Sequence, residues 1–147
     1  MTATGHAILG TVIAAKIGNP ALAIPLALAS HIATDILPHW DTATNGNRRK
    51  PKKLVITTAI DVFVGFAVSF LILKFFFPTT NVSYAFFMIM VSQSFDWLTA
   101  FYYFFNMRFF KWVYDFQKLF DNDLDQPWGI VTQVILVLTI FTASLIF

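Results

Sequence analysis

The sequence predicts an all-α integral membrane protein, in which an N-terminal helical hairpin joins three transmembrane helices and a short interfacial helix. Of the 147 residues, 57% are hydrophobic and 12% are charged, whereas soluble domains are nearer half apolar and a quarter charged. Three segments are long enough to cross a bilayer, which needs about 20 apolar residues. A chain of 147 residues suits one domain and is too short for two. We therefore expect one multi-pass membrane domain over residues 1–147.

The first two apolar segments, Gly5–Ile17 and Ala21–Leu37, predict the hairpin. The sequence Gly18-Asn19-Pro20 between them is a strong turn signal. The first segment is short for a full span, so the pair is either re-entrant or packed inside the bundle. No basic region precedes it, which predicts that residues 1–147 are the mature chain without a cleaved signal.

The three predicted spans are Leu54–Phe77, Tyr84–Phe105 and Trp128–Phe147. Before the first of them, residues 42–53 form a basic loop that holds five of the ten basic residues. The positive-inside rule places this loop in the cytoplasm. Pro127 suits the first turn of the last span.

The segment 107–120 predicts a helix lying in the headgroup plane, because apolar and aromatic residues cover most of its surface. Lys111, Asp115 and Lys118 share its polar face. The alternating acids of 121–125 resemble a calcium loop but lack its glycine and its final glutamate. We interpret them as a solvated turn.

Seven ionisable residues are predicted to lie at one depth near the cytoplasmic side. Asp61 is about 10 Å into its helix from the basic loop, and Asp96 is about 13 Å from the same side of the returning helix, at 1.5 Å per residue. The second arm of the hairpin ends at this side, and its first arm begins there. The seven residues are His6, His31, Asp35, His39, Asp41, Asp61 and Asp96.

Such residues suit a metal site. An aspartate at the centre of a membrane helix costs roughly 2.5–3.5 kcal/mol, and a metal ion offsets this cost by keeping carboxylates ionised. Imidazole and carboxylate bind zinc and other first-row ions, so we expect one or two ions of zinc or manganese. The predicted metal ligands are His6, His31, His39, Asp35 and Asp41. Asp61 and Asp96 are predicted to act as catalytic groups, as further ligands or as a general base.

Each of these residues also has a simpler interpretation. The pair His31 and Asp35, one helical turn apart, is more often only a hydrogen bond. His39 and Asp41 at a helix end could cap it. Asp61 belongs to a stripe of small and polar residues spaced by four, which is typical of a face that packs against another helix. The joint occurrence of seven such residues favours a site.

Two stretches resemble a known family: Gly5-His6, and Ser30-His-Ile-Ala-Thr-Asp35-Ile-Leu-Pro38-His39-Trp-Asp41. The family comprises small bacterial and archaeal inner-membrane proteins, the membrane-bound metal-dependent hydrolases, also described as LexA-binding. Its members have an early histidine and a second helix ending in a motif of the form Asp-Leu-Leu-Pro-His/Asp-x-Asp. The resemblance covers about the first 45 residues and implies a metal site, hydrolase activity and a location in the inner membrane of a prokaryotic cell. A weaker likeness is to helical zinc phospholipases C, which also use His-x3-Asp on a helix.

The sequence therefore predicts a membrane-embedded metal-dependent hydrolase with its site at the cytoplasmic membrane face, acting on a lipid phosphoester or another amphiphilic ester. Membrane lipids are the expected partners, and nucleic acid is not expected. Two alternatives stay open. One is a small proton- or cation-coupled transporter that uses the aspartates as relays. The other is a non-catalytic membrane adaptor with a closed structural metal or polar core.

Overall fold

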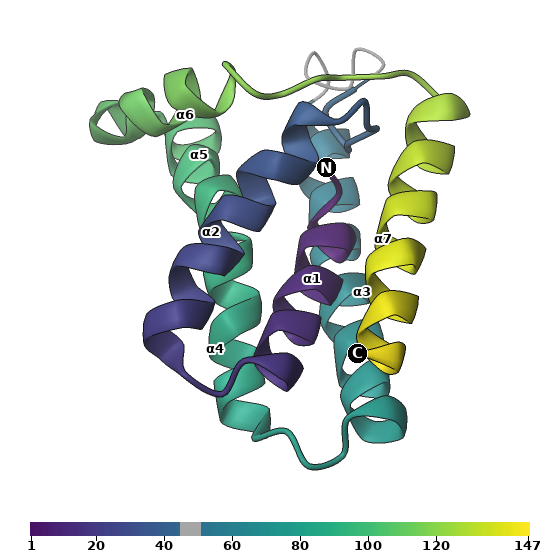
Figure 1. Ribbon diagram of the computed structural model, residues 1–147. Coiled ribbons are helices and arrows are strands. Elements are labelled where there is room, and N and C mark those ends of the chain that lie inside the picture. Colours follow the sequence, from purple (N-terminus) through teal and green to yellow (C-terminus); the bar gives the residue numbers. More distant parts are fainter. Residues whose placement is uncertain (45–50) are drawn as a thin grey trace.

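The computed structural model describes residues 1–44 and 51–147, and within them it is helical with no strand. Figure 1 shows the helices as a bundle, with α5 and α6 at one end of it. Their bounds are α1 Ala3–Lys16, α2 Pro20–Ile36, α3 Pro51–Phe76, α4 Val82–Ser92, α5 Ser94–Phe105, α6 Lys111–Gln117 and α7 Trp128–Ile146, with a 3₁₀ turn, η2, at Arg108–Phe110. The all-helical class predicted from composition is confirmed. Part of the predicted basic loop, Arg48 to Lys50, lies outside the described residues.

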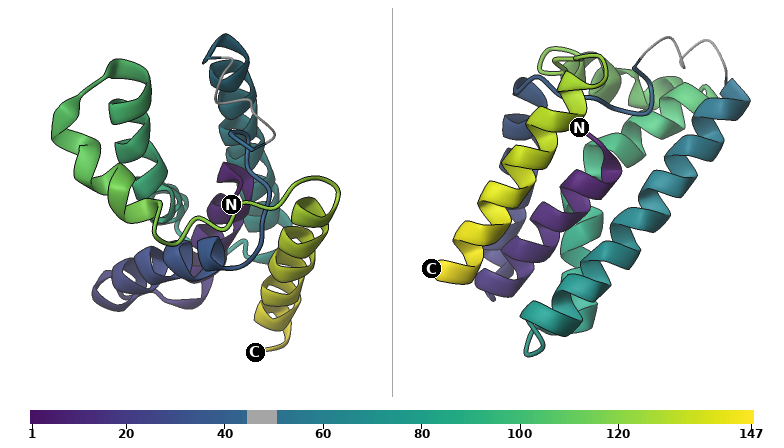
Figure 2. Two further views of the ribbon diagram at one scale, coloured as in Figure 1. Left: turned by 90° about the horizontal axis from the view of Figure 1, so that it is seen from above. Right: turned by 90° about the vertical axis from the view of Figure 1, so that its right-hand side faces the viewer.

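Helix α1 lies at the centre of the bundle, where it contacts α2, α3, α4 and α7. It is apolar on all sides, which is typical of a helix surrounded by others. Seen from above, the N-terminus lies in the middle, with α3, α7 and the α5–α6 pair around it (Figure 2). Of the two arrangements expected for the hairpin, α1 adopts the one inside the bundle.

The turn between α1 and α2 forms as its residues predict. Asn19 caps α2 by accepting a hydrogen bond from the Ala21 amide at 3.0 Å, and Pro20 occupies the first turn. The Tyr84 hydroxyl of α4 donates to the Ile17 carbonyl at 2.8 Å. This end of the hairpin is therefore attached to α4.

Helices α3 and α7 are each long and apolar enough to cross a membrane. Only 17% and 22% of their most apolar stretches are buried. Their outward faces carry large exposed apolar side chains, such as Phe63 and Leu138, as expected for surfaces in contact with lipid rather than with water. The inward face of α3 contains the predicted stripe of small residues, where Gly65 lies against Thr4 and Ala7 of α1.

The segment predicted as a single span, Tyr84–Phe105, is divided into α4 and α5 at Gln93. The Gln93 backbone leaves the helical region, with φ −98° and ψ 4°, and its buried side chain donates from Nε2 to the Ala3 carbonyl at 2.8 Å. Two of the three predicted spans are therefore unbroken helices, and the third consists of two shorter ones.

The predicted interfacial segment forms the 3₁₀ turn and α6, which packs on α5. Its outward side chains include the exposed Phe109 and Trp112, and Lys111 and Asp115 form the expected ion pair one helical turn apart. From α6 the chain crosses the end of the bundle, over the N-terminus, to reach α7 (Figure 1). It pairs there with the segment after α2, because the His39 amide donates to the Asn122 carbonyl at 3.1 Å and the Leu124 amide donates to the His39 carbonyl at 2.7 Å.

Candidate metal centre

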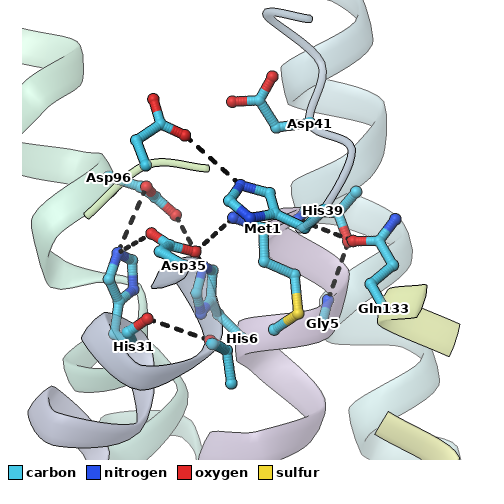
Figure 3. A network of polar contacts seen from close by, with 12 residues as sticks. Met1, Gly5, His6, His31, Asp35, His39, Asp41, Asp96 and Gln133 are labelled. Atoms are coloured by element: carbon cyan, nitrogen blue, oxygen red, sulfur yellow. Dashed lines mark hydrogen bonds and ion pairs between the residues drawn. The ribbon is translucent and has the colours of Figure 1, made fainter. Parts of the chain in front are cut away.

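Three helices bring two histidines and two aspartates together near the start of α1. His6 comes from α1, His31 and Asp35 from α2, and Asp96 from the first turn of α5. The His6 and His31 rings stack, with centroids 3.8 Å apart and an angle of 14° between their planes. Figure 3 shows both rings and both carboxylates converging. We call these four residues the first cluster.

A backbone hydrogen bond fixes the orientation of His31. Its Nδ1 lies 2.8 Å from the Ser92 carbonyl oxygen, which can only accept, so Nδ1 carries the hydrogen. Nε2 then faces Asp35 Oδ2 at 3.2 Å and Asp96 Oδ1 at 3.7 Å. Metal-binding histidines commonly have this arrangement, in which one ring nitrogen donates to a carbonyl and the other is left to bind.

His6 approaches the same carboxylates from α1. Its Nε2 lies 3.3 Å from Asp35 Oδ1 and 3.9 Å from Asp96 Oδ2. Neither ring nitrogen has a hydrogen-bond partner among the described residues, although the side chain is only 1% exposed. The His6 carbonyl accepts from the Ser92 hydroxyl at 2.8 Å, so the serine that orients His31 also fixes the backbone at His6.

The first cluster fits a divalent ion. One ligand atom each from His6, His31 and Asp96 lie within 4.8 Å of one another. Buried polar atoms normally have partners, and an ion between these atoms would supply the partner that the Nε2 atoms of both histidines lack. Asp35 contacts both imidazoles and also accepts a hydrogen bond from the Met1 nitrogen. Imidazole and carboxylate together suit zinc and manganese.

The other two predicted ligands, His39 and Asp41, lie in a separate group. One ligand atom from each lies within 4.8 Å of one from Asp121 and one from Asp123. We call these four residues the second cluster. Burial alone would raise the pKa of the Asp121 carboxyl, but contacts with His39 and Lys118 outweigh it and hold that pKa below its ordinary value.

The Asp61 side chain, which belongs to α3, contacts the first residues of α1. Its Oδ2 accepts from the Ala3 amide at 2.7 Å, and its Oδ1 accepts from the Thr4 amide at 3.2 Å and the Thr4 hydroxyl at 2.7 Å. A carboxylate at the N-terminus of a helix satisfies free amides and is favoured by the helix dipole. Asp61 therefore attaches α3 to α1, as the helix-packing interpretation of its stripe predicts.

Asp96 is positioned by α6. Gln117 Nε2 donates to Asp96 Oδ1 at 2.8 Å, and Gln117 Oε1 accepts from the Thr99 hydroxyl at 2.6 Å. Thr99 thus orients the Gln117 amide, and the amide orients the carboxylate. The predicted interfacial helix is in this way connected to the first cluster.

A cavity of about 170 Å³ lies beside both clusters, lined by α3 and α5, by residues 1–3 and 41–43, and by α6 with the residues just after it. Asp96 of the first cluster, Asp41 and Asp121 of the second, and Asp61 all line it. Its other walls are largely apolar and aromatic. The apolar and aromatic lining residues include Leu54, Val62, Trp97, Ala100 and Phe104.

Four residues that shape these clusters were not predicted as site residues. Asp121 and Asp123 were interpreted as a solvated turn, although their alternation was a visible signal. Gln117 and the Ser92 backbone carbonyl carry no signal that separates them from other polar residues on helices.

Comparison with known proteins finds no matching family model, no matching curated protein and no matching solved structure. The likeness to membrane-bound metal-dependent hydrolases therefore depends on the motif residues of the N-terminal third alone. The geometry of the two clusters stands independently of that likeness.

Proposed function

We propose that this chain is a multi-pass membrane metal-dependent hydrolase with the first cluster as its catalytic centre. The observation that carries the proposal is the orientation of the two imidazoles. His31 is fixed through Nδ1, and the Nε2 atoms of His6 and His31 both face the carboxylates of Asp35 and Asp96. A divalent ion held there, zinc or manganese, would supply Lewis acidity and activate water near neutral pH.

Asp96 is the best candidate for the general base. Of the four residues of the first cluster, it alone lines the cavity. It therefore faces both the imidazole pair and the space in which a substrate would lie, so its carboxylate could bind the ion and also accept a proton from the attacking water. Gln117 holds it in this position. Asp61 also lines the cavity, but its oxygens already bind the start of α1, so we assign it a positioning role.

The cavity favours an amphiphilic substrate. Its lining combines four acidic side chains and several other polar ones with apolar and aromatic side chains. A lipid phosphoester, or another ester with an apolar tail, matches this combination, with the ester near Asp96 and the tail along α3 and α5. Membrane lipids are then both the surroundings and the source of the substrate.

The proposed location is the inner membrane of a prokaryotic cell, with the basic loop 42–53 in the cytoplasm. The chain has no cysteine, so single introduced cysteines report sidedness directly. Lys52→Cys, at the start of α3, should react with an impermeant maleimide only in inverted vesicles. Thr79→Cys, beyond the other end of α3, should react only in intact cells. The reverse pattern would invert the topology.

The test of the function combines metal content with activity. Detergent-purified protein should contain bound zinc or manganese, measured by inductively coupled plasma mass spectrometry, and should hydrolyse at least one lipid phosphoester or fluorogenic amphiphilic ester in a substrate panel. The His31→Ala/Asp35→Ala double variant should lose the hydrolase activity and the ion held by the first cluster. A well-folded wild type that takes up no zinc or manganese would refute the proposal.

A further inference from the structure

The second cluster joins two segments that are distant in the sequence. His39 and Asp41 follow α2, whereas Asp121 and Asp123 lie between α6 and α7. The backbone pairs the two segments around His39, which forms an isolated parallel bridge with Asp123. Backbone hydrogen bonds between the two segments thus bring the four side chains together, and the side chains themselves take no part in these bonds.

The orientation of His39 repeats that of His31. Its Nδ1 lies 2.9 Å from the Leu37 carbonyl oxygen, so Nδ1 carries the hydrogen. Its Nε2 has no hydrogen-bond partner among the described residues, although the side chain is 1% exposed, and it lies 3.5 Å from Asp121 Oδ1. In the neutral tautomer, a nitrogen lone pair therefore faces a carboxylate oxygen, an arrangement that a cation between the two atoms would stabilise.

The Asp41 carboxylate is oriented by hydrogen bonds from residues of its own segment. Its Oδ1 accepts from the Ala43 amide, the Thr44 amide and the Thr44 hydroxyl, each at 2.7 Å. These bonds fix the carboxylate and leave Oδ2 as its available ligand atom. The Thr44 hydroxyl also lies 3.3 Å from Asp123 Oδ1, so one threonine contacts carboxylates from both segments.

We propose that His39, Asp41, Asp121 and Asp123 form a second divalent-cation site, separate from the first cluster. One imidazole with three carboxylates is an oxygen-rich set, which suits Mn²⁺. An ion bound there would hold residues 37–44 and residues 121–124 together. Because Asp41 and Asp121 also line the cavity, the bound ion would also fix the position of one cavity wall. The site is independent of the proposed hydrolase activity, because it uses none of the residues of the first cluster.

The experiment counts ions on the full chain in detergent. Protein stripped with a chelator is titrated with Mn²⁺, and bound Mn²⁺ is measured by electron paramagnetic resonance. Asp123→Asn keeps the size of the side chain and removes its charge, and His39→Gln removes the imidazole. Asp125→Asn is the matched control, because it changes a carboxylate of the same segment that lies outside the cluster.

We expect Mn²⁺ affinity at this site to persist in His31→Ala and to be unchanged in Asp125→Asn. In Asp123→Asn and in His39→Gln, this affinity should fall at least about tenfold, as for other losses in a metal's coordination shells. Mn²⁺ should raise the melting temperature of wild type and Asp125→Asn, and not that of Asp123→Asn, because an ion that binds only the folded state stabilises it.

Two results would overturn the second site. One is Mn²⁺ binding that His31→Ala abolishes and Asp123→Asn leaves intact, which would mean that His39 and Asp121 share only a proton. The other is equal weakening by Asp123→Asn and Asp125→Asn, which would indicate diffuse attraction to acidic residues. If the wild type bound this Mn²⁺ but hydrolysed none of the substrates in the panel, the result would count against the proposed function alone.

Discussion

The rings of His6 and His31 stack at 3.8 Å between centroids, although they belong to different helices. Two charged imidazolium rings at this separation would repel each other, so the stack is suited to neutral imidazoles that share one partner. Ser92 maintains it from a third helix, through its carbonyl to His31 and its hydroxyl to the His6 backbone. The first cluster therefore depends on how closely α1, α2 and α4 pack.

In that packing α1 and α4 approach closely at Gly10, where an added Cβ would lie 2.5 Å from Ser92 Oγ and 2.9 Å from the Met88 carbonyl oxygen. Gly10→Ala should therefore push α1 away from α4. We expect a loss of about 1–3 kcal/mol of stability, typical of overpacking, together with weaker metal binding. Thermal unfolding and metal titration would measure both. Gly18→Ala, with nothing within 4 Å of the added atom, is the control, and equal effects of the two substitutions would contradict this account.

Gln117 is predicted to affect metal binding by orienting Asp96 and not by stabilising the fold. Gln117→Leu removes the hydrogen bond to Asp96 and the one from Thr99. We expect metal affinity at the first cluster to fall by about 10–100-fold, as is usual when a group that orients a ligand is removed. Isothermal titration calorimetry would measure the change.

Lys111→Ala, also on α6, is the matched control for Gln117→Leu. It removes only the exposed ion pair with Asp115, and such pairs contribute little to stability. Unchanged metal affinity in Gln117→Leu would show that α6 does not position Asp96.

Substitutions of Asp61 distinguish a positioning role of this residue from a catalytic one. Asp61→Ala leaves the amides of Ala3 and Thr4 without their acceptor, so we expect a loss of about 0.5–2 kcal/mol of stability, as for other helix caps. Metal content should stay unchanged, and activity per folded molecule should stay within a fewfold of wild type. If Asp61→Asn, which keeps an acceptor oxygen, abolished activity with the fold intact, Asp61 would instead be catalytic, as the sequence first predicts.

The exposed apolar face of α7 tests the membrane assignment. Leu138, 55% exposed near the middle of this helix, should face lipid, and Leu138→Lys should cost about 2.5–3.5 kcal/mol of insertion free energy. We expect less protein in the membrane fraction after carbonate extraction. Leu119→Lys changes a side chain that is 76% exposed beyond the end of α6 and should be tolerated. An insertion defect confined to Leu119→Lys would place the bilayer elsewhere.

Much of the fold follows from local signals in the sequence. Apolar length predicted α3 and α7, and Gly18-Asn19-Pro20 predicted the turn between α1 and α2. The break at Gln93 was not predicted, because the segment as a whole is long and apolar enough for one span, and the Gln93 side chain at the break bonds to the carbonyl of Ala3, which is remote in the chain. A window of neighbouring residues contains no information about that partner.

For the candidate site, the sequence by itself indicated six of the eight residues of the two clusters, and helical spacing placed His31 and Asp35 on one face. Only the tertiary structure decided how these residues divide into groups. His6 joins His31 because α1 lies at the centre of the bundle, whereas His39 turns toward Asp121 because backbone hydrogen bonds pair the two segments. Spacing along a helix fixes neighbours within one element, but contacts between elements depend on packing and on backbone partners that are remote in the chain.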